Sequence, residues 1–497
     1  MIRRFSLGAV LSSVGVAFAA AGFAGAAVPA RLAAQDAAGR PLSLEEALSI
    51  GARTSESVGI ARAGVDRARG QQRQARSEYF PQLTGTASYT RTLRSQFSVL
   101  ADTGSSSEPP PPECRRFIPD PAAPIEERVD SLEAALECAS RADPFAAFAD
   151  LPFGQENQYN LGLQASQLLF AGGRVRAQNR IAGAGRRLAE IELASQEAQN
   201  RLEVAEAYFD ALLGDRLVSI ADSTLAQAER TLENTRLALE VGNVPEFELL
   251  RAQVIRDNAR PVVIQRRAQR DIAYLRLKQL LELPAGDSLV LTTPLDSPAD
   301  SMALAATAVE RRAAVRQAEE NVVVQEGRLA VARAASWPTL RLTSNFSRFG
   351  YPDDLLPAWS DFVSDWNVAL SLSVPLFTGG RLSGDRMVAR ADVDEARLRL
   401  AATRELAALD VETAEAALRA ADAAWSASAG TVEQAQRAYA IAEVRFQEGI
   451  STQTELGDAR VQLQQALANR AQSARDLRVA RLRIELLDAL PLGTAGR

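Results

Sequence analysis

The stretch NLGLQASQLLFAGGR, residues 160–174, decides the fold of this chain. Its first half alternates apolar and polar side chains, because Leu161 and Leu163 point to one side of an extended chain while their polar neighbours point to the other. This is the pattern of a strand with one apolar face. The strand ends at Gly172 and Gly173, and a sequence with helical spacing follows at once.

The segment after the two glycines predicts a single very long helix. Residues 174–241 are rich in Ala, Glu, Arg, Gln and Leu, contain no proline, and place apolar side chains three or four positions apart, as at Leu202, Ala205 and Phe209. At about 1.5 Å per residue this helix is roughly 100 Å long. No single globular domain needs such a rod.

The strand and the long helix occur twice, at a constant offset in residue number. The residues Asn160, Leu163, Ser166, Phe170, Gly172, Gly173 and Arg174 recur as Asn367, Leu370, Ser373, Phe377, Gly379, Gly380 and Arg381. The same offset continues down the helix, where Gly242, Glu248 and Ala252 recur as Gly449, Glu455 and Ala459. An internal duplication of a strand that leads into a long helix is therefore the architecture to explain.

The duplication predicts two repeats joined by a linker. The first repeat covers residues 42–283 and the second covers 301–490, with a linker at 284–300 and a C-terminal tail at 491–497. Each repeat predicts a helix, a strand, a second strand, a long helix, a tight turn and a return helix. The expected strands are residues 83–90, 160–170, 340–347 and 367–376, and the return helices are 246–283 and 453–490. Shorter helices are expected at 44–52, 56–78, 125–139, 301–312 and 313–335.

The N-terminus is interpreted as an export signal at residues 1–34. Arg3 and Arg4 precede an apolar stretch, and small residues follow it, which places the cleavage site at about 26–34. The alternative is an N-terminal membrane anchor. After this segment no apolar run reaches the ~20 residues of a membrane helix, so a membrane-spanning part would have to consist of strands.

The composition suits long packed helices and argues against nucleic acid as a partner. The chain is 47% hydrophobic but only 6% aromatic, and its net charge of -6 lacks the basic excess of nucleic-acid-binding proteins. It contains no histidine, the commonest general base and metal ligand. Phosphate-binding, serine-hydrolase and paired-cysteine motifs are also absent from the sequence. We therefore expect no enzyme, no cofactor and no metal site.

An insertion at residues 101–154 lengthens the hairpin of the first repeat. It contains the only two cysteines of the chain, Cys114 and Cys138. In an exported protein, two cysteines in one polar loop predict a disulfide, and the alternative is two separate thiols. Because the helices leave the strands at the other end, we expect this insertion to be an extracellular loop.

The four strands predict an oligomer. Each is about 10 residues long, which is enough to cross a bilayer when the strand is tilted. Open sheet edges are not tolerated in lipid, and the smallest membrane barrels have about 8 strands, so several chains must combine their strands. The strand end is then a membrane pore and the helix end a conduit. The alternative is an exported coiled-coil scaffold without a pore.

The strand starts YFPQL and WPTL, the junctions LFAGGR and LFTGGR, and the glycine-containing turns resemble the TolC-like outer membrane efflux protein family. The resemblance covers residues 42–490. It implies a mixed α and β membrane protein: a homotrimer whose 12-stranded transmembrane β-barrel continues into a 12-helix periplasmic α-barrel. The implied function is the exit duct of a tripartite efflux or type I secretion system, which exports small molecules or proteins. The implied partners are a periplasmic adaptor protein, an inner membrane transporter (an RND antiporter or an ABC exporter) and outer membrane lipid.

The turns between each long helix and its return helix are the expected contact sites for the adaptor. They are Gly242, Asn243 and Val244 in the first repeat, and Gly449, Ile450 and Ser451 in the second. The glycine pairs at the junctions, Gly172 with Gly173 and Gly379 with Gly380, are expected to act as strand-to-helix hinges. The alternative for these glycines is a phosphate-binding loop, which their recurrence after an amphipathic strand argues against.

Acidic residues beside the turns are expected to ring a closed periplasmic entrance. Glu455 and Asp458 lie three residues apart on one helix face, and Glu248 is the counterpart of Glu455 in the first repeat. The family resemblance implies acids around this opening. The alternative is ordinary solvated acids placed favourably near a helix N-terminus. Arg251 is the counterpart of Asp458 in the first repeat, which leaves open an ion pair between an arginine and a carboxylate.

Overall fold

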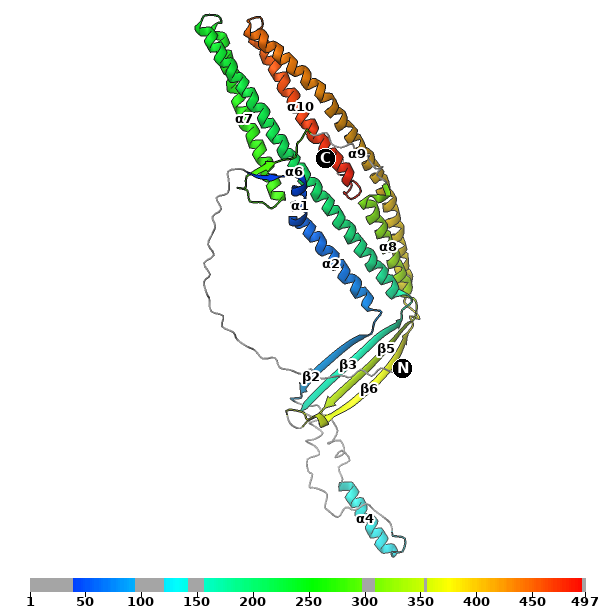
Figure 1. The fold of residues 1–497 in the computed structure, drawn as a ribbon. Coiled ribbons are helices and arrows are strands. Elements are labelled where there is room, and N and C mark those ends of the chain that lie inside the picture. The colour runs from blue at the N-terminus through cyan, green and yellow to red at the C-terminus, as the bar shows by residue number, and fades with distance from the viewer. Residues whose placement is uncertain (1–38, 94–119, 142–155, 297–308, 353–354, 494–497) are drawn as a thin grey trace, which may run out of the picture.

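The computed structural model describes residues 39–93, 120–141, 156–296, 309–352 and 355–493. Within these ranges the molecule is elongated: a four-stranded sheet lies toward one end, and two helical hairpins form the other (Figure 1). None of the described helices is long and apolar enough to cross a membrane.

The two repeats have the same order of main elements. The first contains α1 (Leu44–Thr54), α2 (Glu56–Ser77), β2 (Gln82–Arg91), α4 (Ile125–Arg141), β3 (Asn157–Phe170), α6 (Arg174–Glu240) and α7 (Glu246–Leu280). The second contains α8 (Ala313–Ala334), β5 (Thr339–Gly350), β6 (Phe362–Ser373), α9 (Arg381–Gln447) and α10 (Gln453–Leu486). The four strands, the two long helices and the two return helices expected from the sequence are confirmed, with ends that differ by a few residues.

The long helices α6 and α9 are both 67 residues long and begin in the same way. Gly173 and Gly380, the residues before them, each have φ +86°, a left-handed conformation that glycine adopts without a steric cost. Small buried residues such as Ala198, Ala205 and Ala211 let α6 approach its neighbours closely. The repeated junction sequence thus gives the same strand-to-helix turn twice.

The four strands form one antiparallel sheet in the order β2-β3-β5-β6. The register separates the side chains by polarity. On one side, the apolar face, lie Leu83, Ala87, Leu161, Leu163, Leu342, Phe346, Trp366, Val368 and Leu370. On the other, the polar face, lie Thr84, Thr86, Gln164, Ser166, Arg341, Thr343, Asn345, Asn367 and Ser371. Strands β2 and β6 form the two edges, and within the described part of the chain no strand pairs with their outer sides.

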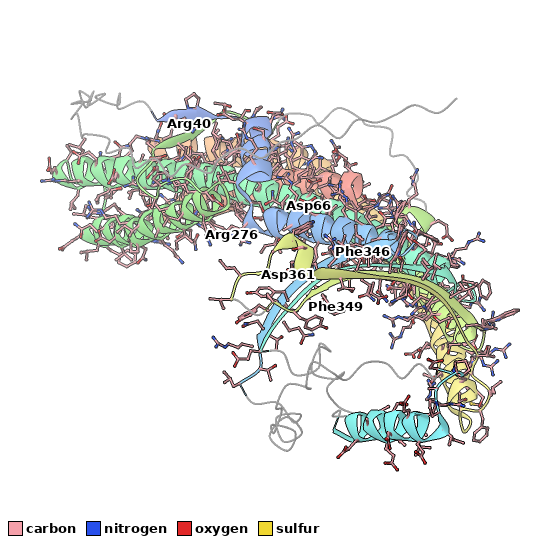
Figure 2. The ribbon with its side chains drawn as sticks, turned by 90° about the horizontal axis from the view of Figure 1, so that it is seen from below. Arg40, Asp66, Arg276, Phe346, Phe349 and Asp361 are labelled. Atoms are coloured by element: carbon pink, nitrogen blue, oxygen red, sulfur yellow. The ribbon has the colours of Figure 1, made fainter. Side chains whose placement is uncertain are left out.

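The sheet is strongly curved and lies apart from the helical hairpins. Figure 2 labels Phe346 and Phe349 of β5 and Asp361, which precedes β6, in the curved region. Because all four strands bend together, the sheet is an arc, and it does not close within the described part of the chain.

The main hydrophobic core lies halfway along the helices, where α1, α6 and α7 meet. Leu42, Val204, Tyr208 and Leu277 are fully buried there. The Tyr208 hydroxyl donates to the Leu42 carbonyl at 2.8 Å, so the buried phenol has a partner and also fixes the start of the described chain on α6.

The linker and the helix ends differ from the expectation. The expected linker contains β4 (Leu289–Leu291), which pairs in parallel with β1 (Arg40–Leu42), a strand that the sequence analysis missed. The helix expected at 301–312 is described only from residue 309, where Val309–Arg311 is a single 3₁₀ turn and not an α-helix. The return helices end at Leu280 and Leu486, three and four residues earlier than expected.

Several expectations lie outside the described residues. They include the export signal and Cys114, while Cys138 lies in α4 but its side chain is not described. The disulfide therefore stays a prediction, as does the extracellular position of residues 101–154.

The two junction glycines before the N-cap positions provide a matched pair of substitutions. Gly172 and Gly379 have φ +60° and +58°, so alanine is strained at both, by about 1–2 kcal/mol. A Cβ at Gly172 would also lie 2.5 Å from Trp337 Cβ, whereas a Cβ at Gly379 would meet open space. We expect Gly172→Ala to lower the free energy of unfolding by about 1–3 kcal/mol more than Gly379→Ala does, measured by denaturant unfolding. Equal losses would contradict the close approach at Gly172.

Candidate functional site

Both helical tips are closed by the same hydrogen-bonded turn. Gly242 and Gly449 have φ +78° and +70°, the left-handed conformation that ends many helices. In each turn the residue after the glycine donates its N–H five residues back, Asn243 to the Ala238 carbonyl and Ile450 to the Arg445 carbonyl, both at 2.8 Å. The dipeptides Gly242-Asn243 and Gly449-Ile450 therefore form equivalent turns at the two tips.

The tips expose most of their side chains. Asn243 is exposed, Ile450 is 69% exposed, and Val244 and Ser451 are half-buried at the start of the return helices. The structure thus places all six expected contact residues at the end of the molecule farthest from the sheet (Figure 1).

Glu455 is held within its own hairpin. Its backbone N–H donates to the Thr452 hydroxyl at 3.4 Å, which caps α10, and its carboxylate lies 3.6 Å from the Arg445 guanidinium of α9. Both side chains of this ion pair are nearly half exposed, so the pair contributes at most about 1 kcal/mol. Glu455 therefore has a local partner that lies beside it in the same tip.

Glu248 connects the two hairpins. We assign the Gln453 amide the orientation in which its nitrogen faces Glu248, because only then does it donate, to Glu248 Oε2 at 2.8 Å and to the Glu248 carbonyl at 3.2 Å. Gln453 is only 2% exposed, although it is the first residue of α10. This buried contact joins α7 to α10 just inside the tips, and the sequence analysis did not single out Gln453.

Asp458 faces a groove of about 470 Å³ between α6, α7 and α10, which we call the tip groove. Arg251 also lines this groove, but within the described ranges it forms no ion pair with Asp458. The ion pair between an arginine and a carboxylate, which the sequence left open, is formed instead by Arg445 and Glu455. Arg460 lines the same groove and is 7% exposed, and burial lowers the pKa of its guanidinium.

The second hairpin is packed by an aromatic residue behind the tip. Tyr439 of α9 is buried with Ala442 and Leu456, and its hydroxyl donates to Glu443 at 3.1 Å. Burial, together with the charge of Glu443, raises the pKa of Tyr439 to about 12. The phenol is therefore neutral at physiological pH and acts as a packing residue with a satisfied hydroxyl.

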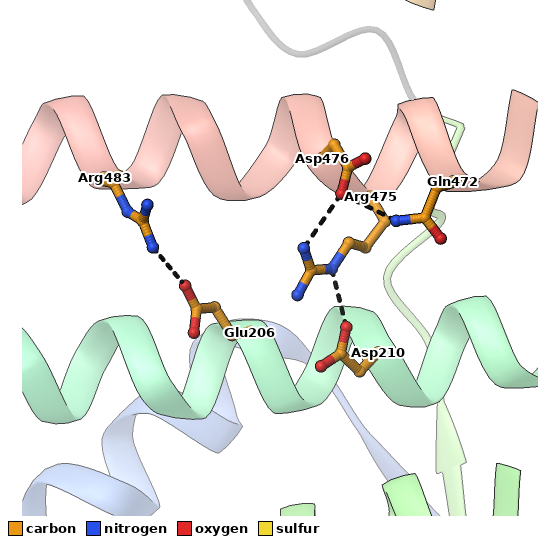
Figure 3. Close-up of polar contacts among 6 residues, drawn as sticks. All are labelled: Glu206, Asp210, Gln472, Arg475, Asp476 and Arg483. Carbon is orange, nitrogen blue, oxygen red and sulfur yellow. Dashed lines mark hydrogen bonds and ion pairs between the residues drawn. The ribbon is translucent and has the colours of Figure 1, made fainter. Parts of the chain in front are cut away.

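Farther from the tips, ion pairs hold α10 against α6 (Figure 3). Arg475 bridges Asp210 of α6 at 2.8 Å and its own neighbour Asp476 at 3.1 Å. Arg483 lies 3.1 Å from Glu206, one helical turn before Asp210. Because the side chains of Arg475 and Arg483 are only 22% and 15% exposed, these pairs are less screened by solvent than the surface pairs of the helices.

These contacts between hairpins were not predicted from the sequence. Arg475 and Asp210 are 265 residues apart, and arginine and acidic residues are common throughout both helices. The only sequence signal was the constant offset between the repeats. It shows that both repeats have equivalent long and return helices, so that the return helix of one can pack on the long helix of the other. Across the described ranges, no group of three or more acidic, cysteine or histidine residues could hold a metal ion.

Comparison with known proteins identifies the family of this chain. The model for the outer membrane efflux protein family matches residues 145–282 and 304–489, more than half of the chain. The chain therefore belongs to the outer membrane efflux protein family. This is a family of outer membrane channels and not of enzymes, and the protein is located in the outer membrane and extends into the periplasm.

Two curated relatives come from Pseudomonas putida. The chain is 29% identical to the toluene efflux pump outer membrane protein TtgF over 243 residues, which is 47% of this chain and 48% of that protein. It is 26% identical to the solvent efflux pump outer membrane protein SrpC over 341 residues, 63% of this chain and 68% of that one. The chain thus spans about half the length of TtgF.

A solved structure shows the same fold over nearly the whole chain. The crystal structure of CusC, reported with conformational changes accompanying folding and transmembrane channel formation, superimposes with a TM-score of 0.69. The match covers 90% of this chain and 92% of CusC at 18% sequence identity.

Proposed function

We propose that the protein is a homotrimeric exit duct of a tripartite efflux or type I secretion system. In this proposal, three chains of four strands form a 12-stranded barrel in the outer membrane, and their long and return helices form a 12-helix barrel in the periplasm. A periplasmic adaptor and an inner membrane transporter, either an RND antiporter or an ABC exporter, deliver small molecules or proteins to it. The observation that carries the proposal is the four-stranded sheet, which has two unpaired edges within the described residues and separates an apolar face from a polar face.

The sheet supports the proposal through its edges. Strand β2 is exposed along its whole length and β6 at every residue after Phe362, although each is at least 10 residues long and carries one apolar side. Such edges are unstable in lipid unless another strand pairs with them. Pairing β2 of one chain with β6 of the next removes every edge while keeping the apolar face toward lipid and the polar face toward the lumen.

The helices support it through exposed apolar side chains at helical spacing. On α7 these are Phe247, Leu250, Val254, Ile264, Ile272 and Leu275, each 49–68% exposed. They are 3, 4, 10, 8 and 3 residues apart, which are sums of three- and four-residue steps and place them along one side of the helix. A stripe of this length in a periplasmic helix is stable when the neighbouring protomer covers it.

The first test is the mass of the mature protein in detergent. We expect light scattering to give three times the mass of the mature chain, because only association satisfies the strand edges. The protein should also require detergent for solubility. A monomeric mass, or solubility without detergent, would favour the alternative of a coiled-coil scaffold without a pore.

The acidic entrance gives a second prediction, for which Glu455→Gln is combined with Asp458→Asn. Three copies of Glu455, Asp458 and Glu248 would surround one opening, where carboxylates favour cations over anions. We expect the double variant to lose most of the cation preference of the purified trimer in planar bilayers. Glu412→Gln, on an exposed part of α9 far from the tips, is the control and should leave selectivity unchanged. Unchanged selectivity in the double variant would show that these acids do not form the entrance ring.

A further inference from the structure

The apolar face of the sheet carries two arginines with very different surroundings. Arg91, at the end of β2, lies 3.4 Å from Glu156 and is therefore paired. Arg348 is opposite Leu161 on β3 and Ser364 on β6, and no described carboxylate pairs with it. An unpaired charge on a lipid-facing surface costs free energy unless water or an anion reaches it.

Arg348 is fixed in place by groups that leave its outer nitrogens available. Its guanidinium carbon lies 4.6 Å from the centroid of the Trp359 ring, and its Nε donates to the Ser364 hydroxyl at 3.1 Å. The two terminal nitrogens have no hydrogen-bond partner within the described part of the chain. A guanidinium held in this way presents two parallel donors, the arrangement that binds phosphate oxygens.

An apolar hollow of about 490 Å³ lies directly beside this arginine. Gly85, Leu161, Leu163 and Phe346 line it, together with Arg348 and Trp359. The hollow exists because β2 has a glycine in the row where β3 and β5 carry Leu163 and Phe346. A Cβ at Gly85 would meet nothing closer than Leu163 Cδ2 at 3.6 Å. Charge and apolar surface thus adjoin in one site.

The position of the site along β5 indicates which part of the membrane it meets. Strand β5 starts at Thr339, next to the long helices, and ends at Gly350, so Arg348 lies near the end away from the long helices (Figure 1). With the helices in the periplasm, this end lies at the outer surface of the membrane. Tryptophan and arginine side chains are both favoured at such an interface.

We propose that Arg348, Trp359 and the hollow at Gly85 bind a phosphorylated lipid of the outer leaflet. The phosphate binds the terminal nitrogens of Arg348, and an acyl chain occupies the hollow against Leu161, Leu163 and Phe346. A free phosphate would use only the charge and a hydrocarbon only the hollow, whereas a phosphorylated lipid uses both. The proposal rests on the proposed function, because it requires the apolar face of the sheet to face lipid.

Native mass spectrometry of the full mature protein, released from detergent, tests the site. The probes are bisphosphorylated lipid A and the same lipid without its phosphates. We expect the wild-type trimer to retain the phosphorylated lipid, Arg348→Gln to weaken that retention about tenfold, and the dephosphorylated lipid to bind equally weakly to both. Gly85→Leu, which fills the hollow without a change of charge, should also weaken binding.

Arg341→Gln is the matched control, because Arg341 lies on the same strand but on the polar face, opposite Ser371. Its lipid retention should equal that of the wild type. The lipid site would be overturned if intact Arg348→Gln trimers retained lipid A as well as wild-type trimers do. It would also be overturned if wild-type trimers bound the dephosphorylated lipid as well as the phosphorylated one. Loss of the trimer in the wild-type spectrum would instead contradict the proposed function.

Discussion

Asp410→Ala should lower the free energy of unfolding by about 3–5 kcal/mol, the largest stability loss that we expect from a single side chain in this molecule. Asp410, in the middle of α9, pairs with Arg312, which directly precedes α8. Arg312 is 0% exposed and Asp410 is 7% exposed. Removing the carboxylate leaves a guanidinium buried without its ion-pair partner, whereas the wild-type pair offsets much of the cost of burial.

The surroundings of Arg312 show how strongly it depends on Asp410. Its Nε and Nη1 are buried without hydrogen-bond partners among the described residues, and burial lowers the pKa of the guanidinium even though Asp410 and Asp488 both act to raise it. Asp410 also accepts a hydrogen bond from the Gly493 N–H at 3.3 Å, so it fixes the end of the described chain to α9. The pair therefore joins α8, α9 and the segment after α10.

Two variants separate the buried charge from a general loss of packing. Replacing both partners, Arg312→Met with Asp410→Leu, should restore most of the stability, because an apolar pair of similar volume requires no desolvated charge. Glu433→Gln, which breaks an exposed pair with Arg437 on the same helix, should cost less than about 1 kcal/mol. Denaturant unfolding of the purified protein at one fixed protein concentration measures all three variants. A double variant as unstable as Asp410→Ala would show that the loss comes from packing.

The sequence predicted those elements whose signals are local. The alternation in β3, the glycine pair at Gly172 and the proline-free helical spacing of α6 each act within a few residues, and the duplication repeats them. Strand β1 was missed because it has only three residues, and its pairing of Arg40 with Leu289 joins distant parts of the chain. A strand that short has no periodicity to detect.

The candidate site was predictable in position but not in its contacts. Gly242 and Gly449 mark the tips through their local turn chemistry, and the acids beside them follow from the repeat offset. The partners of these acids depend on how α7 and α10 face each other, which two helices rich in arginine and glutamate do not specify. Gln453 is the clearest case, because a polar residue at a helix start is normally solvated, and here it is 2% exposed.

The contact of Gln453 with Glu248 leads to the second prediction of a large effect, an increase in channel conductance. Each chain contributes one such contact between its hairpins just inside the tips. A hydrogen bond to a charged group contributes about 1.5–3 kcal/mol, so the three copies of the proposed trimer contribute roughly 4.5–9 kcal/mol to the arrangement in which the hairpins touch. Moving a two-state equilibrium from 1:99 to 99:1 takes about 5.5 kcal/mol. If the touching arrangement is the closed entrance, loss of these contacts is large enough to open it.

We therefore expect Gln453→Ala to raise the conductance of the purified protein in planar bilayers severalfold. The pairs of Arg475 with Asp210 and of Arg483 with Glu206 remain in this variant, so the hairpins stay joined farther from the tips and separate only at the entrance. The matched control is Gln472→Ala on the same helix, because the Gln472 amide donates only within α10, to Asp476 at 3.0 Å. Its conductance should equal that of the wild type. A Gln453→Ala trimer with wild-type conductance would mean that the contact between α7 and α10 does not hold the entrance closed, and closure would then depend on contacts between protomers.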